Sequence, residues 1–224
     1  ILANSAVANA TTLLWSTSGT GSFNNITALH PVYTPSAADI AAGTVTLTLT
    51  ATPAAPCSPA SDDMVLTISR QAVANAGADV TLCEGAAYTV TDATAANATS
   101  LQWSHNGTGT LTGETTITPT YTPATGETGV ITLTLTATSA GPCVNATDQM
   151  TITINPAVTV SAGPDDIICE TDGSYVLANS AVTNATTLQW ATSGTGFFNN
   201  PNTLNPVYTP SAADIAAGTV TLTL

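Results

Sequence analysis

The sequence predicts an all-β fold built from antiparallel β-sandwich repeats of about 87 residues in tandem. Two observations carry this prediction. Residues 31–49 return letter for letter as residues 206–224, and a shortened copy covers residues 119–135. Within the block, apolar residues alternate with threonine from Thr44 to Thr52, which is the period-two pattern of a half-buried strand.

Other landmarks repeat with the same period. The three tryptophans recur at intervals of 88 and 87 residues: Trp15, Trp103 and Trp190. The four cysteines form two sets of equivalents, each 86 residues apart: Cys57 with Cys143, and Cys83 with Cys169. The chain therefore divides into repeats at residues 1–70, 71–156 and 157–224, of which the middle one is complete. Because both ends fall within a predicted strand, we expect a segment of a longer array.

Each long block reads as an extended start, a short helical turn and a long strand. Ser36 followed by Asp39 has the spacing of a helix N-cap with an acid three residues later. Gly43 is expected to end this turn with a positive φ. The middle copy departs from the pattern at residues 124–127, so we expect its helical turn to be lost.

The complete repeat has the strand spacing of an immunoglobulin-like sandwich. We predict these strands: Val80–Cys83, Tyr88–Ala93, Ser100–Ser104, Thr115–Tyr121, Val130–Thr138 and Gln149–Asn155. Trp103 falls on the third of them and is predicted to lie in the core, with Trp15 and Trp190 at equivalent places. Three tyrosines that precede the turn resemble a tyrosine corner and are also assigned to the core: Tyr33, Tyr121 and Tyr208. Short linkers favour an elongated, semi-rigid rod.

Charge excludes two classes of partner. Arg70 is the only Lys or Arg, against 14 acids, and the formal net charge is −13. Nucleic acids and anionic membrane surfaces are bound through clustered Lys and Arg. We therefore expect no nucleic-acid partner. We expect no membrane insertion either, because no apolar run approaches the length of a membrane helix.

Regular cysteine spacing suggests disulfides and an oxidising, extracellular setting. In the complete repeat the predicted pair is Cys83 with Cys143, and closing this loop of about 60 residues would add roughly 4 kcal/mol of stability. Cys57 and Cys169 are expected to pair with residues outside this chain. The alternative is buried free thiols, whereas a zinc site is disfavoured because no CxxC pair occurs.

Calcium is the one metal that the sequence suggests. Asp62 and Asp148 come just before the predicted last strand of their repeats, and Asp79 and Asp165 follow 17 residues later. Carboxylates that meet at a domain junction could hold this hard cation together with backbone carbonyls. The favoured alternative is that each aspartate caps a turn through a hydrogen bond.

No pattern typical of an enzyme occurs. His30 and His105 are the only histidines and neither recurs in the other copies, so each is interpreted as an isolated surface residue. No nucleophile elbow, zinc-protease or phosphate-loop motif is present. We predict that the chain is not an enzyme and binds no cofactor unless it binds calcium.

The combined motifs resemble a known kind of repeat. They comprise Ala-Gly-x-Asp-x-x-x-Cys-Glu at 76–84 and 162–170, Leu-x-Trp at 101–103, Tyr-Thr-Pro-Ser-Ala-Ala-Asp-Ile-Ala-Ala-Gly at 33–43, Pro-Cys at 142–143 and Asp-x-Met-x-Ile-x-Ile at 148–154. Over its whole length the chain is similar to the PKD-like, immunoglobulin-like repeats of giant Bacteroidetes surface adhesins, including gliding-motility adhesins. The resemblance implies type IX secretion and a long filament attached at the outer membrane. It also implies contact with substratum or polysaccharide, and with outer-membrane motility or secretion machinery.

These observations predict a structural stalk segment of an extracellular adhesin, which gives reach and mechanical continuity. Near-identical copies fit a spacer, because a specific ligand site rarely needs verbatim repetition. Two alternatives remain open. Repeated weak carbohydrate binding would act through multivalency, and an accessory array would belong to a secreted enzyme without carrying its catalysis.

Overall fold

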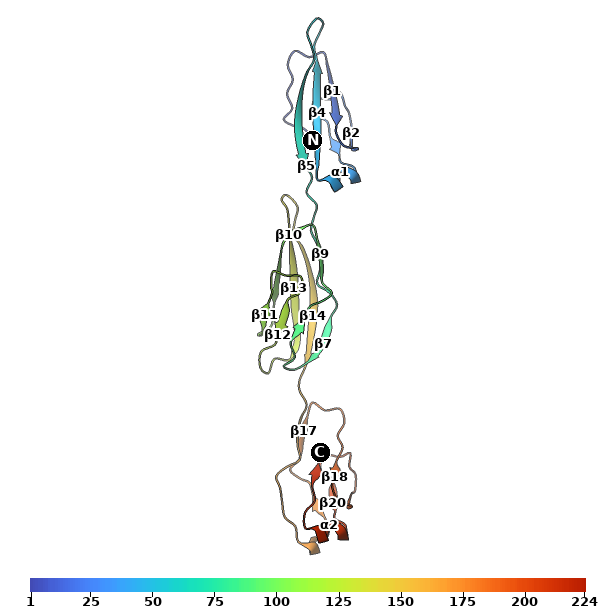
Figure 1. Cartoon of the computed structure of the whole chain (residues 1–224), viewed down its shortest axis with the longest axis vertical. Helices are drawn as coiled ribbons and strands as arrows, with labels where there is room; N and C mark the ends of the chain where they lie inside the picture. Colours follow the sequence, from blue (N-terminus) through green and yellow to red (C-terminus); the bar gives the residue numbers. More distant parts are fainter. The chain divides into compact units, whose positions relative to one another are not determined.

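The computed structural model describes all 224 residues and shows an all-β protein, as predicted (Figure 1). Strands make up 41% of the chain and helix only 7%. The two α-helices, α1 (Ala37–Ala42) and α2 (Ala212–Ala217), have six residues each. Neither these nor the short 3-10 turn η1 (Glu170–Asp172) has the length and apolar character needed to cross a membrane.

Backbone contacts divide the chain into two compact units. The first comprises Ile1–Asp79, Ala87–Thr122 and Ile131–Ile152. The second comprises Val80–Ala86, Pro123–Val130 and Thr153–Leu224. Each is described by itself.

The first unit begins with an antiparallel sheet in the order β1-β4-β5. Its strands are β1 (Thr12–Thr17), β4 (Thr44–Thr52) and β5 (Ala60–Thr67), and the small ribbon β2 (Ser22–Phe23) with β3 (Tyr33–Thr34) accompanies them. The predicted alternation on β4 is confirmed: Val45, Leu47 and Leu49 are buried, while the threonines between them are not. Trp15 lies opposite Leu49 in the register, so both contribute to one core.

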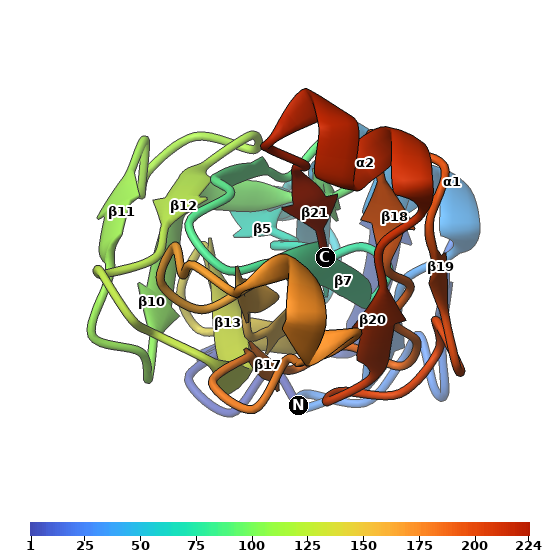
Figure 2. The same ribbon diagram turned by 90° about the horizontal axis from the view of Figure 1, so that it is seen from below.

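The remainder of this unit holds most of the complete repeat. Its strands are β6 (Val73–Asn75), β8 (Tyr88–Thr89), β9 (Thr94–Ala96), β10 (Ala98–His105), β11 (Thr110–Thr112), β12 (Thr120–Thr122), β13 (Gly129–Ser139) and β14 (Ala146–Asn155). Two sheets have the orders β10-β13-β14-β7, where β7 is Val80–Cys83, and β11-β12-β8, and β6 pairs with β9. Figure 2 shows β11 and β12 in one layer and β10 and β13 in the other. Trp103, Leu133, Leu135 and Ile152 fill the space between them.

Two predicted strands are shorter than expected. Of the predicted strand Tyr88–Ala93, only β8 (Tyr88–Thr89) forms. A single strand over Thr115–Tyr121 was predicted, but the chain forms β11, then a turn, then β12 only from Thr120. Gly113 has φ 71°, and the Thr116 amide donates to its carbonyl at 2.9 Å. Residues 113–116 therefore form a turn that begins at a left-handed glycine, and this turn removes the first residues of the predicted strand from the sheet.

Strand β7 (Val80–Cys83) joins its sheet in an unexpected direction. Ala76 N donates to Asp148, Thr151 N donates to Asp79, and Glu84 N donates to Asn155 O. The partners on both segments advance together along the chain. Strand β7 therefore runs parallel to β14, whereas the other registers are antiparallel.

The second unit contains the third repeat. Its elements after β7 are β15 (Thr159–Ser161), η1, β16 (Tyr175–Val176), β17 (Ala181–Thr183), β18 (Ala191–Thr192), β19 (Phe197–Phe198), β20 (Val207–Thr209), α2 and β21 (Leu222–Thr223). The pairings are β15-β17, β16-β20-β19 and β18-β21. Leu177, Trp190 and Tyr208 form its core.

Candidate functional site

The most elaborate polar arrangement is centred on a buried carboxylate in the helical turn. Asp39 is 3% exposed and accepts four hydrogen bonds. Thr20 N donates to Oδ1 at 3.0 Å, and Gly21 N donates to Oδ2 at 2.9 Å. Ser36 N and the Tyr33 hydroxyl also donate to Oδ2, at 3.0 and 2.7 Å. One side chain therefore joins a hairpin turn, a helix start and a core tyrosine.

The local sequence explains why the carboxylate points inward. Ser36 caps α1, accepting from Asp39 N at 3.1 Å, and the two residues form a capping box as predicted. Gly43 ends the helix with φ 77°, also as predicted. The same box that starts the helix thus fixes Asp39 beneath the turn at residues 17–21.

The third repeat reproduces this arrangement around Asp214, which is 7% exposed. Its carboxylate accepts from Thr195 N at 2.9 Å, Gly196 N at 2.8 Å and Ser211 N at 3.0 Å. The Tyr208 hydroxyl donates to it at 2.7 Å. We call each of these two sets, centred on Asp39 and Asp214, an aspartate knot.

Hydrogen bonding dominates the electrostatics of both knots. The Tyr33 hydroxyl and then the Ser36 amide hold the pKa of the Asp39 carboxyl well below its usual range. The Ser211 and Thr195 amides, followed by the Tyr208 hydroxyl, do the same for the pKa of Asp214. Burial opposes the effect in both cases but is outweighed. Each carboxylate is therefore an ionised structural acceptor, and it lacks the raised pKa of a general acid.

The middle repeat builds the turn differently. No helix forms there, as expected from its shortened sequence. Glu127 takes the position of the capping acid, and its Oε2 accepts from Ala124 N at 2.9 Å. Gly109 N donates to the Tyr121 hydroxyl at 3.1 Å. His105 packs against the Tyr121 ring with 5.1 Å between centroids, so it is not the surface residue that the sequence suggested.

The glycine in this turn has no room for a side chain. A Cβ at Gly109 would lie 2.4 Å from the Thr122 carbonyl oxygen and 2.7 Å from the Tyr121 hydroxyl. We expect Gly109→Ala to lower the free energy of unfolding of the middle repeat by about 2–3 kcal/mol, because backbone atoms must move. Gly141→Ala is the matched control, since nothing lies within 4 Å of its Cβ and its φ is not positive. Urea unfolding followed by hydrogen exchange of residues 71–156 measures both, and equal effects would contradict the prediction.

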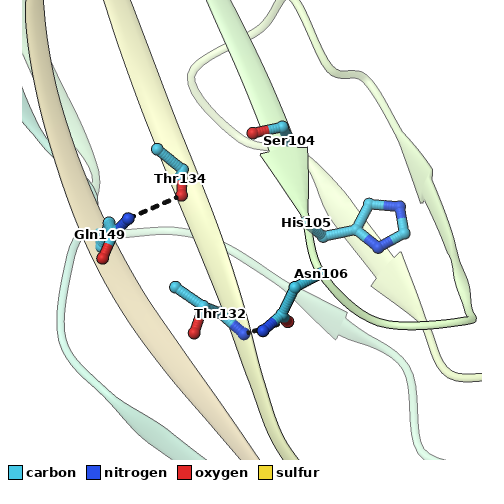
Figure 3. A pocket seen from close by; sticks show the side chains of 6 residues that line it. All are labelled: Ser104, His105, Asn106, Thr132, Thr134 and Gln149. Atoms are coloured by element: carbon cyan, nitrogen blue, oxygen red, sulfur yellow. Dashed lines mark hydrogen bonds between the residues drawn. The ribbon is translucent and has the colours of Figure 1, made fainter.

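A shallow hollow of about 370 Å³ lies on the outer face of the middle sheet (Figure 3). Gln149 Nε2 donates to Thr134 Oγ1 at 3.2 Å, and Thr132 N donates to the Asn106 side chain at 2.8 Å. Figure 3 shows the His105 ring turned away from these groups. The lining carries no carboxylate, and its one titratable side chain is His105, so it offers no paired acid–base groups.

Two of the four aspartates of the predicted calcium sites accept hydrogen bonds from backbone amides, and the other two are exposed. No group of three or more His, Cys, Asp or Glu residues is placed to hold a metal. Asp79 accepts from Thr151 N at 2.7 Å and Asp148 accepts from Ala76 N at 2.8 Å, so both brace β7 against β14. Asp62 lies exposed on β5, and Asp165 is exposed too. Calcium at these residues stays a prediction.

Chelation tests that prediction directly. Because backbone amides already occupy Asp79 and Asp148, we expect EDTA to leave the melting temperature of the full chain unchanged within about 1 °C. Calcium added at millimolar concentration should likewise produce no shift. A rise with calcium that Asp79→Asn abolishes would instead place an ion at this residue.

The structure does not contain the predicted disulfide within the middle repeat. All four cysteines are free thiols. Cys143 precedes the first residue of β14, whereas Glu84, which follows Cys83, bonds to the last residue of β14. Ten strand residues separate the two positions by about 30 Å. A disulfide needs Cα atoms about 4–7 Å apart, so this pairing is corrected.

The tryptophans and tyrosines assigned to the core lie there. Trp15, Trp103 and Trp190 are 5%, 1% and 2% exposed. Tyr121 and Tyr208 are buried, and Tyr33 is half-buried against Phe23. What sequence reasoning missed is that the tyrosine corner and the capping acid are bonded to each other. The available signal was that Tyr33 and Asp39 recur at the same spacing as Tyr208 and Asp214.

Comparisons with known proteins concern the fold alone. No protein-family model and no curated protein sequence matches the chain. Extracellular domains 3–5 of Drosophila OTK are 14% identical, with TM-score 0.40, over 91% of this chain and 76% of that one. The N-terminal eight Ig domains of Down syndrome cell adhesion molecule are 11% identical, with TM-score 0.41, over 97% and 35%.

An endo-fucoidan hydrolase of glycoside hydrolase family 107 is 14% identical, with TM-score 0.29, over 92% of this chain and 35% of the enzyme. The two-layer sheets with a central tryptophan define the chain as a tandem array of immunoglobulin-like β-sandwich repeats.

Proposed function

We propose that the chain is a stalk segment of an extracellular adhesin, whose role is to carry load and to hold binding regions away from a surface. The observation that carries this proposal is that the two identical blocks contain residues that fold the repeat. Residues 31–49 and 206–224 contain the tyrosine, cap and aspartate of the two knots and the glycine that ends each helix. Residues 31–49 also include the first part of the core strand β4. These residues fold the repeat and present no shared ligand-binding surface.

Load enters such a repeat through its strands. Trp15 lies opposite Leu49, and the flanking strands β1 and β5 both pair along β4. The Asp39 knot lies at the start of β4, where it joins this strand to the turn after β1. Repeating this scaffold adds length without adding a new site, which suits a spacer.

The wider setting belongs to the same proposal and rests on the resemblance of the motifs. The protein is exported, by the type IX route, and forms a filament at the outer membrane for surface attachment or gliding. Other parts of the full-length protein contact the substratum or polysaccharide and the motility machinery. The net charge of −13, with a single arginine, suits a surface filament that must not adhere to itself.

Pulling single molecules by the two ends tests the stalk function. We expect a distinct unfolding event for the complete middle repeat, with a contour-length gain of about 27 nm for its roughly 87 residues. Extension at low force without such an event would overturn the proposal.

Multivalent carbohydrate binding is the competing function. Phe197 is 64% exposed and is the one large aromatic side chain positioned to stack on a sugar. Its equivalent in the first repeat is Ser22, so it does not form a repeated platform. Saturable binding of the full chain to a polysaccharide, lost in Phe197→Ala, would favour this function over the stalk.

A further inference from the structure

Cys143 lies against the end of the preceding repeat. Its Sγ is 3.4 Å from the Ser69 carbonyl oxygen. The loop that carries it holds the neighbouring residues as well, because the Ser69 hydroxyl donates to Gly141 O at 3.0 Å and Ala72 N donates to the Ser139 hydroxyl at 2.8 Å. The thiol is therefore held at the last residue of one repeat by a loop of the next.

Cys83 lies beside the end of its own repeat. The amide of Glu84, the residue after it, donates to Asn155 O at 2.8 Å. Asn155 is the equivalent of Ser69, 86 residues further along. The Glu84 carboxylate also accepts from Ala157 N at 3.0 Å, in the segment that leads into the following repeat.

Both junctions begin the next repeat in the same way. Asn97 Nδ2 donates to Gln71 O at 3.2 Å, and Asn184 Nδ2 donates to Ala157 O at 2.8 Å. These asparagines have matching left-handed conformations, with φ 55° and 61°. The contacts seen at Ser69 can therefore be carried over to Asn155.

Each junction shows one of two contacts at equivalent carbonyls. The Ser69 carbonyl lies against the thiol of Cys143, and the Asn155 carbonyl accepts from the amide that follows Cys83. Combining the two junctions would bring a Cys83-type residue and the Cys143-type residue of the next repeat to the same carbonyl. We propose that these two cysteines form a disulfide that staples successive repeats. This inference rests on the proposed stalk function. The disulfide would serve that function by giving a covalent path across each junction.

The arrangement accounts for four free thiols in this chain. A residue at the Cys143 position of the third repeat would be the partner of Cys83, and a residue at the Cys83 position of the first repeat would be the partner of Cys143. Cys57 and Cys169 likewise have partners in flanking repeats. No two of the four cysteines are therefore predicted to bond to each other.

Bond formation needs an oxidant of the disulfide class. The two thiols lose two protons and two electrons as one S–S bond forms, and oxidised glutathione takes them up as its own S–S bond breaks into two thiols. The step requires no other group from the protein.

The repeat itself supplies the test. Because residues 1–49 align with 176–224, the full chain can be extended after Leu224 with a copy of residues 50–70, which completes the third repeat and adds a copy of Cys57. A second extension uses residues 136–156 and adds a copy of Cys143. Each chain is oxidised with glutathione, its free thiols are alkylated, and unreduced peptides are identified by mass spectrometry.

We expect one disulfide, between Cys83 and the appended cysteine, with all other thiols alkylated. Cys143→Ser should leave this bond intact, and Cys83→Ser should abolish it. A bond from Cys83 to Cys143, or full alkylation of an extended chain that hydrogen exchange shows to be folded, would overturn the proposal. The second extension decides the matter if the first does not fold. The pulling experiment uses the unextended chain, which contains no predicted pair, so the two proposals fail independently.

Discussion

Replacing Trp103 with alanine is expected to remove about 3–5 kcal/mol from the free energy of unfolding of the middle repeat. The side chain is 1% exposed, and its indole nitrogen donates to Thr116 O at 3.0 Å. The substitution leaves a large cavity between the two sheets and an unpaired carbonyl. Because small domains have only about 5–15 kcal/mol of stability in total, the repeat should be partly unfolded at 37 °C.

Hydrogen exchange in increasing urea measures this loss for each repeat separately. Peptides from residues 71–156 should lose protection at a lower urea concentration, while peptides of the first repeat should change little. Val144→Ala is the control, since Val144 is 68% exposed in the same repeat and should shift stability by less than about 0.5 kcal/mol. A loss below 1 kcal/mol for Trp103→Ala would mean that the core can close around the missing ring.

Most of the fold was predictable because apolar and polar residues alternate with period two along a half-buried strand. The alternation on β4 required one face of a sheet, and the repeated tryptophan required a core for it to enter. The helix cap at Ser36 and the glycine at 43 were equally local signals. Each depends on residues at most a few positions apart, so sequence spacing alone identifies them.

Errors arose where the outcome depends on which segments lie side by side. The Cys83–Cys143 pairing assumed that two cysteines in one repeat are close, but the parallel course of β7 along β14 places them at opposite ends of that strand. The same pairing of strands gives Asp79 and Asp148 backbone amides as partners. The direction in which β7 pairs depends on tertiary structure, and no sequence pattern within β7 predicts it.

The aspartate knot was predictable in its parts only. The cap and the tyrosine corner were each identified, yet their connection depends on the 2.7 Å bond between the Tyr33 hydroxyl and Asp39. The turn at residues 19–21 completes it with two backbone amides, which carry no sequence signature of their own. Only the close approach of glycine makes room, because a Cβ at Gly21 would lie 2.4 Å from the Tyr33 hydroxyl.

The double variant Asp39→Asn, Asp214→Asn is expected to melt about 5–10 °C lower than the parent at neutral pH. In each knot, four donors face the negative charge of the aspartate, and asparagine lacks this charge. The NH2 group of asparagine also places a further donor against these four donors. The effect should be confined to the first and third repeats, since the middle repeat uses Glu127 in this turn. Hydrogen exchange measured for each repeat shows which repeats lose stability. Fluorescence of Trp15 and Trp190, in parent and variant chains that also carry Trp103→Phe, gives the same information.

Acid should reduce this difference, and the direction follows from the lowered pKa of both carboxyls. Their ordinary pKa of 3.8 applies to the unfolded chain, which binds protons first as the pH falls. The stabilisation is therefore complete above about pH 5 and is lost progressively below the ordinary pKa, as the pH falls towards the folded value. Neutralising the other acids also relieves the repulsion of a chain with net charge −13, but this acts equally on parent and variant. The melting-temperature gap should be clearly smaller at pH 2 than at pH 7, and a gap that stays constant between these two pH values would show that charge plays no part in the knots.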